Sequence, residues 1–210
     1  MAFTYFFRDM EVLECAVRHL VPLVSGRSRV VIWDAGCATG EEPYSLAIVL
    51  AERMGEFAFR NLGIIATDMD ENGAFQGIIE AGEYTAEAVA AMPETIRSKY
   101  FIPVKDGRYY LLDERVRKRV KFLRHDLRSL APVQDGFCMV VCKNVLLHLS
   151  HEERVGVFRM FHGAMEPGGL LVTEQTQNLA AEVESLFERR SGECRVYSKL
   201  ELPAQRARNT

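Results

Sequence analysis

Two patterns of apolar residues alternate along the chain. One is helical: residues 10–24 carry apolar side chains on one helix face, and Gly26 follows where a helix would end. The other is a short continuous apolar run that ends in turn residues, which is typical of a strand buried on both faces. Such runs occupy residues 30–36, 63–68, 137–142 and 169–174. Strands that alternate with helices predict an α/β fold built on a mostly parallel sheet.

Two helices between these runs have well-marked ends. The first is expected over residues 41–54, with two carboxylates and Pro43 in its first turn, where the helix dipole and the free N–H groups favour them. The second is expected to begin after Ser150, which has Glu153 at the spacing of a capping box. It should end before residues 166–169, whose proline and glycines cannot continue a helix.

The middle of the chain departs from this alternation. Residues 100–104 and 108–112 flank an Asp-Gly turn, and a further apolar run follows at residues 119–123. We therefore expect a small antiparallel β excursion around residues 100–123.

Length and composition favour one domain. The chain has 210 residues, of which 48% are hydrophobic and 26% charged, and this is enough to bury one large core. We divide it into an N-terminal linker and helix (1–26), a main domain (27–200) and a flexible tail (201–210). Within the main domain, residues 179–189 predict an amphipathic helix and residues 194–200 a strand.

The sequence carries no signal for a membrane, an oxidising compartment or a metal. No apolar run approaches the roughly 20 residues that cross a bilayer, and the first residues lack a signal-peptide core, so a cytoplasmic location without membrane insertion is expected. The five cysteines are an odd number without a CxxC pair, which argues against a disulfide framework and a zinc ribbon. We expect reduced cysteines and no bound metal.

Residues 108–128 form a basic segment. It holds eight Lys or Arg and three Asp or Glu, a local charge of +5 in a chain whose net charge is −3. We interpret it either as a solvated charged face or as a docking surface for an acidic partner. Because the whole chain is acidic and the segment lacks a stacking pattern of aromatic residues, no nucleic-acid partner is expected.

Residues 34–42, with the sequence DAGCATGEE, are the strongest candidate for a ligand site. Gly36 and Gly40 let the backbone turn tightly after a strand and present N–H groups at the start of the next helix. The segment is not a P-loop, which needs a lysine and a hydroxyl, and it is not the GxGxxG pattern, whose helix end faces a pyrophosphate. Glu41 and Glu42 would repel phosphate groups.

Carboxylates beside a glycine turn suit a ligand that carries an ammonium and a sulfonium as well as a carboxylate. S-adenosylmethionine has these groups. Asp68 ends the second strand, where an acid commonly accepts hydrogen bonds from ribose hydroxyls in open α/β sheets. The alternative is that Asp34, Glu42 and Asp68 merely cap helices.

Six segments resemble the CheR-type chemotaxis receptor glutamate methyltransferases in their order and spacing. They are TYFFRD (4–9), WDAGCATGEEPYSLA (33–47), ATDMD (66–70), GEY (82–84), KYF (99–101) and CKNVLLHLS (142–150). The resemblance implies a Rossmann-like class I methyltransferase fold with a seven-stranded sheet. It also implies methyl transfer from S-adenosylmethionine to glutamate side chains in the cytoplasmic domain of a chemoreceptor-like protein, with S-adenosylhomocysteine as the second product.

The resemblance further implies which residues bind the cofactor. Thr4 and Arg8 match family positions that contact it from the N-terminal linker. Glu42 matches the acid that holds the methionine ammonium, and Asp68 matches the acid that binds the ribose.

Two residue pairs complete the implied site. Asp126 and Leu127 match a pair that borders the adenine, and Lys143 and Asn144 match an Arg-Asn pair beside the methyl-transfer centre. His148 stands near the acceptor, where the family commonly has a tyrosine.

The chemistry needs little acid–base help. A free glutamate has a pKa of about 4.3 and is already an anion at neutral pH, so it can attack a methyl group without a general base. Arg8 is the best candidate to steer this carboxylate, because a guanidinium can bind it bidentately; the alternative is a salt bridge on the cofactor side.

Several departures from the family pattern leave the acceptor open. A histidine at 148 can hydrogen bond as a tyrosine does, act as a base for a neutral acceptor, or be purely structural. Thr176-Gln177 lies where a Ser-Glu pair is usual, and the family's N-terminal helical domain is not expected ahead of Thr4. The alternatives are a methyltransferase redirected to a small molecule or another protein, and a catalytically silent S-adenosylmethionine-binding regulator.

Overall fold

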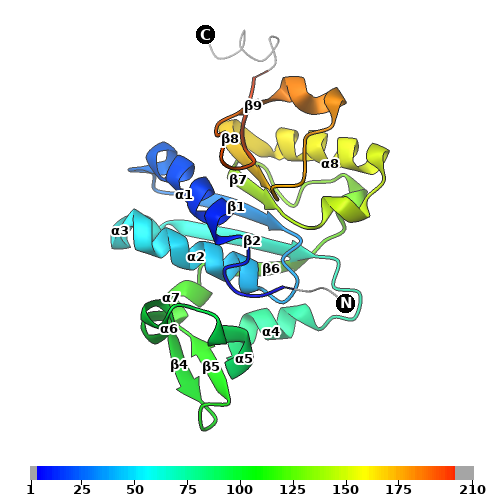
Figure 1. Ribbon diagram of the computed structural model, residues 1–210. Helices are drawn as coiled ribbons and strands as arrows, with labels where there is room; N and C mark the ends of the chain where they lie inside the picture. The colour runs from blue at the N-terminus through cyan, green and yellow to red at the C-terminus, as the bar shows by residue number, and fades with distance from the viewer. Residues whose placement is uncertain (1–3, 202–210) are drawn as a thin grey trace.

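A central seven-stranded sheet organises the computed structural model, which describes residues 4–201 (Figure 1). The strand order is β6-β2-β1-β7-β8-β10-β9. The strands are β1 (Val30–Ala35), β2 (Leu62–Asp68), β6 (Val120–Arg124), β7 (Phe137–Cys142), β8 (Met165–Thr173), β9 (Phe187–Arg189) and β10 (Val196–Lys199). The first five strands in sheet order are parallel, and β10 is antiparallel to both of its neighbours. The predicted mostly parallel sheet is confirmed.

Helices cover both faces of this sheet (Figure 1). Helices α1 (Met10–Val24) and α2 (Glu41–Met54) pack on one face, where Leu13 and Leu20 are fully buried. Helix α8 (His151–Ala164) packs on the other face and buries Phe158 and Phe161, the latter edge-on to Trp33. Two hydrophobic cores, one on each face, therefore hold the strand ends in fixed positions.

The predicted start of α8 is confirmed by its capping box. The Ser150 hydroxyl accepts from the Glu153 N–H, at 3.3 Å, and the Glu153 carboxylate accepts from the Ser150 N–H, at 2.7 Å. These bonds satisfy two N–H groups that the first helical turn leaves without backbone partners.

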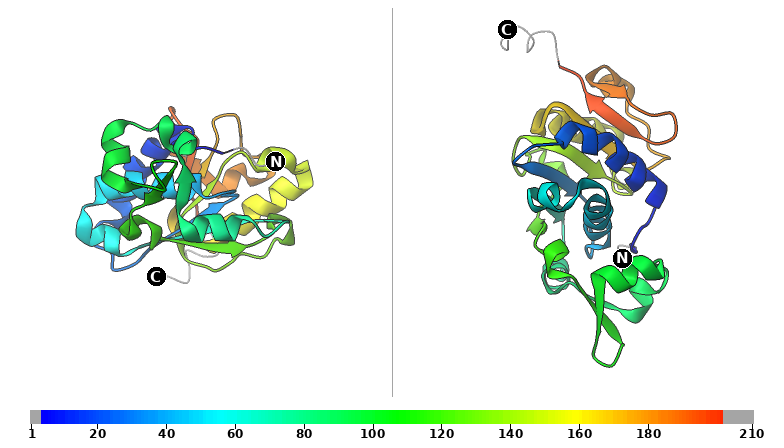
Figure 2. Two further views of the ribbon diagram at one scale, coloured as in Figure 1. Left: turned by 90° about the horizontal axis from the view of Figure 1, so that it is seen from below. Right: turned by 90° about the vertical axis from the view of Figure 1, so that its left-hand side faces the viewer.

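A three-stranded antiparallel sheet, β3-β5-β4, projects from the main body (Figure 2). Its strands are β3 (Glu83–Thr85), β4 (Phe101–Val104) and β5 (Tyr109–Leu112). The short helices around it are α3 (Glu56–Arg60), α4 (Phe75–Ala81), α5 (Ala86–Ala90), α6 (Glu94–Tyr100) and α7 (Glu114–Arg117). The hairpin predicted for the middle of the chain is confirmed.

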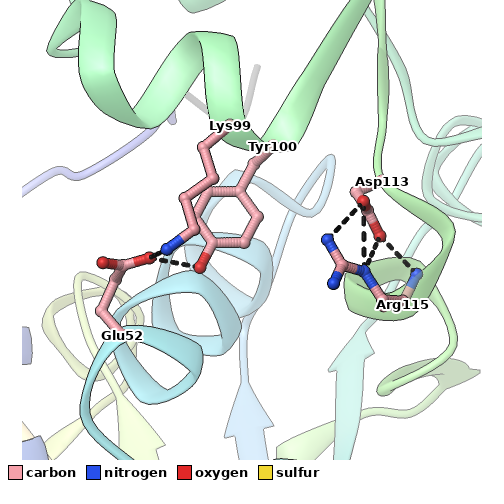
Figure 3. Close-up of polar contacts among 5 residues, drawn as sticks. All are labelled: Glu52, Lys99, Tyr100, Asp113 and Arg115. Carbon is pink, nitrogen blue, oxygen red and sulfur yellow. Dashed lines mark hydrogen bonds and ion pairs between the residues drawn. The ribbon is translucent and has the colours of Figure 1, made fainter. Parts of the chain in front are cut away.

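Polar contacts join this small sheet to the main body (Figure 3). The Glu52 carboxylate on α2 accepts from the Lys99 ammonium, at 2.7 Å, and from the Tyr100 hydroxyl on α6. Asp113 accepts from the Arg115 N–H, at 2.7 Å, at the start of α7. The hydrogen bond from Lys99 holds the pKa of Glu52 below its usual value.

The structure corrects the expectation for residues 119–123. We expected this run in the antiparallel excursion, but it forms β6 and pairs in parallel with β2, with Val120 opposite Ile64. Phe122 is buried in the main core. The place of the third strand in the small sheet is taken by β3, which no sequence pattern indicated.

The helix predicted over residues 179–189 is also wrong. The segment forms a short 3-10 helix, η3 (Ala181–Leu186), and then β9, in which Phe187 pairs with Lys199 of β10. Pairing with the sheet edge outweighs the helical periodicity of so short a segment. The strand predicted over residues 194–200 is confirmed as β10, and residues 202–210 of the predicted tail lie outside the described residues.

One cysteine pair contradicts the expectation that all five are reduced. Cys15 on α1 and Cys194 before β10 form a disulfide, although 179 positions separate them in the sequence. Cys37, Cys138 and Cys142 are free, as expected, and all three are buried. Chain folding brings α1 next to the segment that precedes β10, and cysteine spacing alone could not show this.

The described part of the chain contains no helix with the length and apolar character that crossing a membrane requires.

The order of the strands also identifies where a ligand can bind. From β1 the chain moves outward through β2 to β6, and then returns to the other side of β1 as β7 and β8. Open α/β sheets bind ligands in the crevice at the carboxyl ends of the strands where the order reverses, here between β1 and β7.

Candidate active site

A cleft of about 600 Å³ opens at this point of the sheet. It is lined by residues that follow β1, β2, β6 and β7 and by the N-terminal segment before α1. The residues that the sequence singled out and that the structure brings to its wall are Thr4, Arg8, Gly36, Glu42, Asp68, Asp126, Leu127, Lys143, Asn144 and His148. Its volume is within the range of cofactor sites, so the cleft can enclose much of a nucleoside-sized ligand.

The turn after β1 approaches the cleft closely because Gly36 has no side chain. Its φ is +105°, and a Cβ atom there would lie 2.0 Å from Cγ2 of Val145. The N–H groups of Gly36 and Cys37 donate to the Thr67 carbonyl, at 2.7 and 3.0 Å. The turn is therefore fixed against β2, and only glycine fits at its first bend.

Asp68 connects this turn with the end of β2. One of its carboxylate oxygens accepts from the Ala38 N–H, at 2.9 Å, and the other accepts from the Asp70 N–H, at 3.3 Å. Its side chain is half-buried and reaches the cleft. A carboxylate held in this way keeps lone pairs for a ligand's hydroxyl groups.

Lys143 forms a buried charge cluster beneath the methionine end expected for the ligand. Its ammonium lies 2.9 Å from the Glu42 carboxylate and 3.4 Å from that of Asp9, and it donates to the Arg8 carbonyl at 3.1 Å. The Lys143 side chain is 0% exposed. Burial lowers the pKa of Lys143, but the Glu42 and Asp9 carboxylates outweigh it, and the pKa lies above its usual value.

The N-terminal segment is anchored over α2. The Phe7 N–H donates to the Ser45 hydroxyl, at 2.8 Å, and both Phe7 and Asp9 have positive φ angles. Such conformations are uncommon for these residue types and persist where surrounding contacts fix them. They bring Thr4 and Arg8 to the cleft wall from a segment that precedes the first helix.

Residues 2–196 match the sequence family described as CheR methyltransferase, SAM binding domain. The chain belongs to this family. It is 31% identical over 189 residues to chemotaxis protein methyltransferase 2 of Vibrio cholerae, covering 88% of this chain and 64% of the relative. It is 33% identical to a chemotaxis protein methyltransferase of Listeria innocua, covering 79% and 61%, and 33% identical to chemotaxis protein methyltransferase 1 of Pseudomonas aeruginosa, covering 80% and 63%. The chain thus spans less than two thirds of the length of these relatives.

The cleft of this CheR-family chain fits S-adenosylmethionine on its own geometry. Asp34 is the last but one residue of β1, on the face covered by α2; it is 0% exposed, and neither of its carboxylate oxygens has a hydrogen-bond partner among the described residues. Burial first, and the neighbouring Glu42 second, raise the pKa of Asp34 well above its usual value. Lys143 pairs with Glu42, which lines the cleft, but not with Asp34, so an additional cation such as the ligand's ammonium would offset the cost of ionising these buried carboxylates.

The adenine end is bordered by the segment after β6. Asp126 accepts from the N–H and the guanidinium of Arg128, at 2.9 and 3.1 Å, and this holds the pKa of Asp126 below its usual value. Leu127 is buried and offers an apolar surface. Asp126 and Leu127 thus provide acceptor and apolar surfaces suited to a purine with an exocyclic amine.

The opposite end of the cleft lies after β7. Asn144 has a φ of +59°, and its N–H donates to the buried Glu174 carboxylate at 3.1 Å. His148 is exposed on the cleft wall. Backbone strain of this kind gathers at functional sites, and the hydrogen bond to Glu174 holds the Asn144 backbone in this conformation.

Gly40 is the one predicted site residue that does not line the cleft. It precedes α2 with a φ of +96°, and a Cβ there would lie 2.7 Å from Ile79 and 2.9 Å from the Tyr84 hydroxyl. Its role in the structure is the close packing of the turn against α4 and β3.

Sequence reasoning missed several residues of the wall, which are Ala38, Thr67, Met69, His125, Arg128, Val145, Leu147 and Leu149. Most of them are neighbours of predicted residues at strand ends, so strand position is the signal that could have found them.

Among residues 4–201, no group of three or more His, Cys, Asp and Glu side chains is arranged to hold a metal ion.

Proposed function

We propose that the protein transfers a methyl group from S-adenosylmethionine to glutamate carboxylates of a chemoreceptor-like protein, giving methyl esters and S-adenosylhomocysteine. The support is the arrangement of Arg8, Asn144 and His148 around the end of the cleft beside β7. The names of the relatives support the chemotaxis assignment.

The proposed cofactor contacts follow the cleft wall. Asp68 accepts from the ribose hydroxyls, while Glu42, with Asp34 beneath it, accepts from the methionine ammonium. Asp126 and Leu127 border the adenine. Thr4, Gly36, Lys143 and Asn144 complete the contacts, and the hydrogen bond from Lys143 holds the Glu42 carboxylate in position.

The bound cofactor supplies a methyl group on a sulfonium, a good leaving group that takes no proton. The glutamate oxygen forms the new bond to carbon as the carbon–sulfur bond breaks, and the sulfur keeps the electron pair. The anion and the sulfonium are both neutralised, so the protein only has to hold oxygen, carbon and sulfur in line. Such positioning can lower the barrier by roughly 7–11 kcal/mol.

Arg8 and His148 are proposed as the residues that touch the acceptor. The Arg8 guanidinium can bind the glutamate carboxylate bidentately and orient the attacking oxygen. His148 can donate a hydrogen bond to the other oxygen. A neutral acceptor would instead need His148 as a base.

The experiment is methyl transfer from radiolabelled S-adenosylmethionine to a chemoreceptor cytoplasmic fragment. Carboxyl methyl esters release labelled methanol in mild alkali, whereas methylated amines do not. Alkali-labile label that disappears when the accepting glutamates are changed to alanine is expected. Alkali-stable label, or no transfer to any receptor fragment by a protein that binds the cofactor, would contradict the proposal.

A further inference from the structure

A second, smaller cavity of about 340 Å³ lies between the first turns of α8 and the segment that follows β8. Its polar wall includes His151, Arg154, Thr176 and Gln177, and Leu179 and Ala180 contribute apolar surface. It shares no residue with the main cleft, whose wall ends at Leu149, two positions before His151. The segment after β8 leads into η3, which packs against α8 (Figure 1).

Arg154 gives this cavity an uncompensated positive charge. Its Nε–H group is buried and has no hydrogen-bond partner among the described residues, and no carboxylate within residues 4–201 forms an ion pair with its guanidinium. The other basic residue of the wall, His151, is already engaged, because its Nε2 lies 2.8 Å from the Glu182 carboxylate. Buried donors are almost always paired in folded proteins, so an unpaired one indicates a missing partner.

A carboxylate on a short aliphatic stem is the group that fits this wall. The planar guanidinium of Arg154 binds carboxylates through parallel N–H donors, and the Thr176 hydroxyl can add a further donor. Leu179 and Ala180 are partly exposed and provide apolar surface for the methylene groups of an acidic side chain. The Gln177 amide donates to the Asn178 carbonyl, at 2.7 Å, which stabilises the loop that forms the cavity's outer wall.

The cavity lies beside the end of the main cleft that follows β7. Strand β8 neighbours β7, with Thr173 opposite Cys142, so the segments leaving the two strands run side by side. Glu174 accepts from the Asn144 N–H and joins these segments directly. None of the residues proposed for the cofactor follows β8, so the β8 side of the cleft is available to a protein acceptor.

We propose that the Arg154 cavity binds a second carboxylate of the protein acceptor, on an Asp or Glu that flanks the glutamate being methylated. This inference rests on the proposed function, because it assumes an acidic protein acceptor at the main cleft. Arg154 then selects acceptors in which two acidic side chains are spaced to reach both sites, and it contributes to acceptor binding rather than to the methyl-transfer step.

The test compares Arg154→Gln with Arg159→Gln, an exposed arginine on the same helix that lies outside the cavity wall. Methyl transfer to a receptor cytoplasmic fragment is measured over a range of fragment concentrations. For Arg154→Gln, KM for the fragment should rise about tenfold or more, while kcat and the Kd for S-adenosylmethionine change less than twofold. The KM of Arg159→Gln should equal that of the unmodified protein. Arg154→Lys keeps the positive charge but loses the paired N–H donors of the guanidinium, so its KM should lie between those of the unmodified protein and Arg154→Gln.

A matched series on the acceptor identifies the partner carboxylate. Each Asp or Glu flanking the accepting glutamate is changed in turn to Asn or Gln. One change should raise KM about tenfold with the unmodified enzyme and have no further effect with Arg154→Gln. Circular dichroism checks that the variants are folded. If Arg154→Gln does not fold, Arg154→Lys replaces it in the KM measurements.

The outcomes separate this inference from the proposed function. Equal KM values for the unmodified protein and the folded Arg154 variants, with methyl esters still formed, would overturn the inference alone. Weaker calorimetric binding of inorganic phosphate by Arg154→Gln, with an unchanged KM for the fragment, would assign the cavity to a free anion and also overturn it. If the unmodified protein binds S-adenosylmethionine but forms no ester on any fragment, the proposed function falls and the inference falls with it.

Discussion

Replacing the buried Lys143 with methionine removes the cation that pairs with both Glu42 and Asp9. Methionine has similar length and no charge, so the change isolates electrostatics from packing. A buried pair that loses one partner costs about 3–5 kcal/mol, because the other charge stays buried without compensation. For a chain of this length each kcal/mol lowers Tm by roughly 2–4 °C, so Tm should fall by about 6–20 °C.

Urea unfolding at pH 7, followed by circular dichroism, measures this free energy. Lys118→Met is the control, because Lys118 forms only a solvent-exposed pair with Glu114, and such pairs contribute little to stability. Adding Glu42→Gln to Lys143→Met should restore most of the lost stability, since it removes the uncompensated carboxylate. Equal stability of the Lys143 and Lys118 variants, or no recovery in the double variant, would refute this electrostatic reasoning.

Three further predictions concern burial, sterics and covalent structure. Burial raises the pKa of Asp34, so above about pH 4 this group loses its proton more readily in the unfolded chain than in the folded protein, and stability falls as pH rises. Asp34→Asn removes this effect, so its stability relative to the unmodified protein should increase with pH. A difference in urea unfolding that does not change with pH would contradict this. Gly36→Ala places a Cβ against Val145 at a positive φ, so it should abolish calorimetric cofactor binding, and Val145→Ala in the same chain should recover only part of it. Thiol titration of the denatured, unreduced protein should give three free thiols, and five would contradict the Cys15–Cys194 disulfide.

The main fold could be predicted because its signals are local. Continuous apolar runs mark strands buried on both faces, and the Ser150–Glu153 spacing marks a helix start wherever the helix packs. The β6 run carries the same local signal as a hairpin strand, and only its pairing with β2 decides which sheet it joins. The Cys15–Cys194 disulfide likewise depends on contacts between distant parts of the chain.

The same difference between local signals and contacts of distant residues applies to the site. Asp68 and Glu42 could be predicted because strand ends and helix starts define the ligand crevice of an α/β sheet. Gly40 could not be distinguished from Gly36 by sequence, because both have positive φ and only the packing of Ile79 and Tyr84 shows that Gly40 is turned away. The unpaired Arg154 gave no sequence signal, since pairing is a property of three-dimensional neighbours.

Calorimetric titration with S-adenosylmethionine and S-adenosylhomocysteine tests the central claim most directly, that the cleft at the ends of β1, β2 and β7 is the cofactor site. The unmodified protein should bind both ligands. Asp68→Asn keeps an acceptor for the Ala38 N–H but loses the charge that holds the ribose, and hydrogen bonds to charged groups contribute about 1.5–3 kcal/mol, so its Kd should rise at least about tenfold. Asp135→Asn, on an exposed loop outside the cleft, should bind as the unmodified protein does. Absence of binding by the folded chain, or equal affinity for the Asp68 variant, would contradict the account.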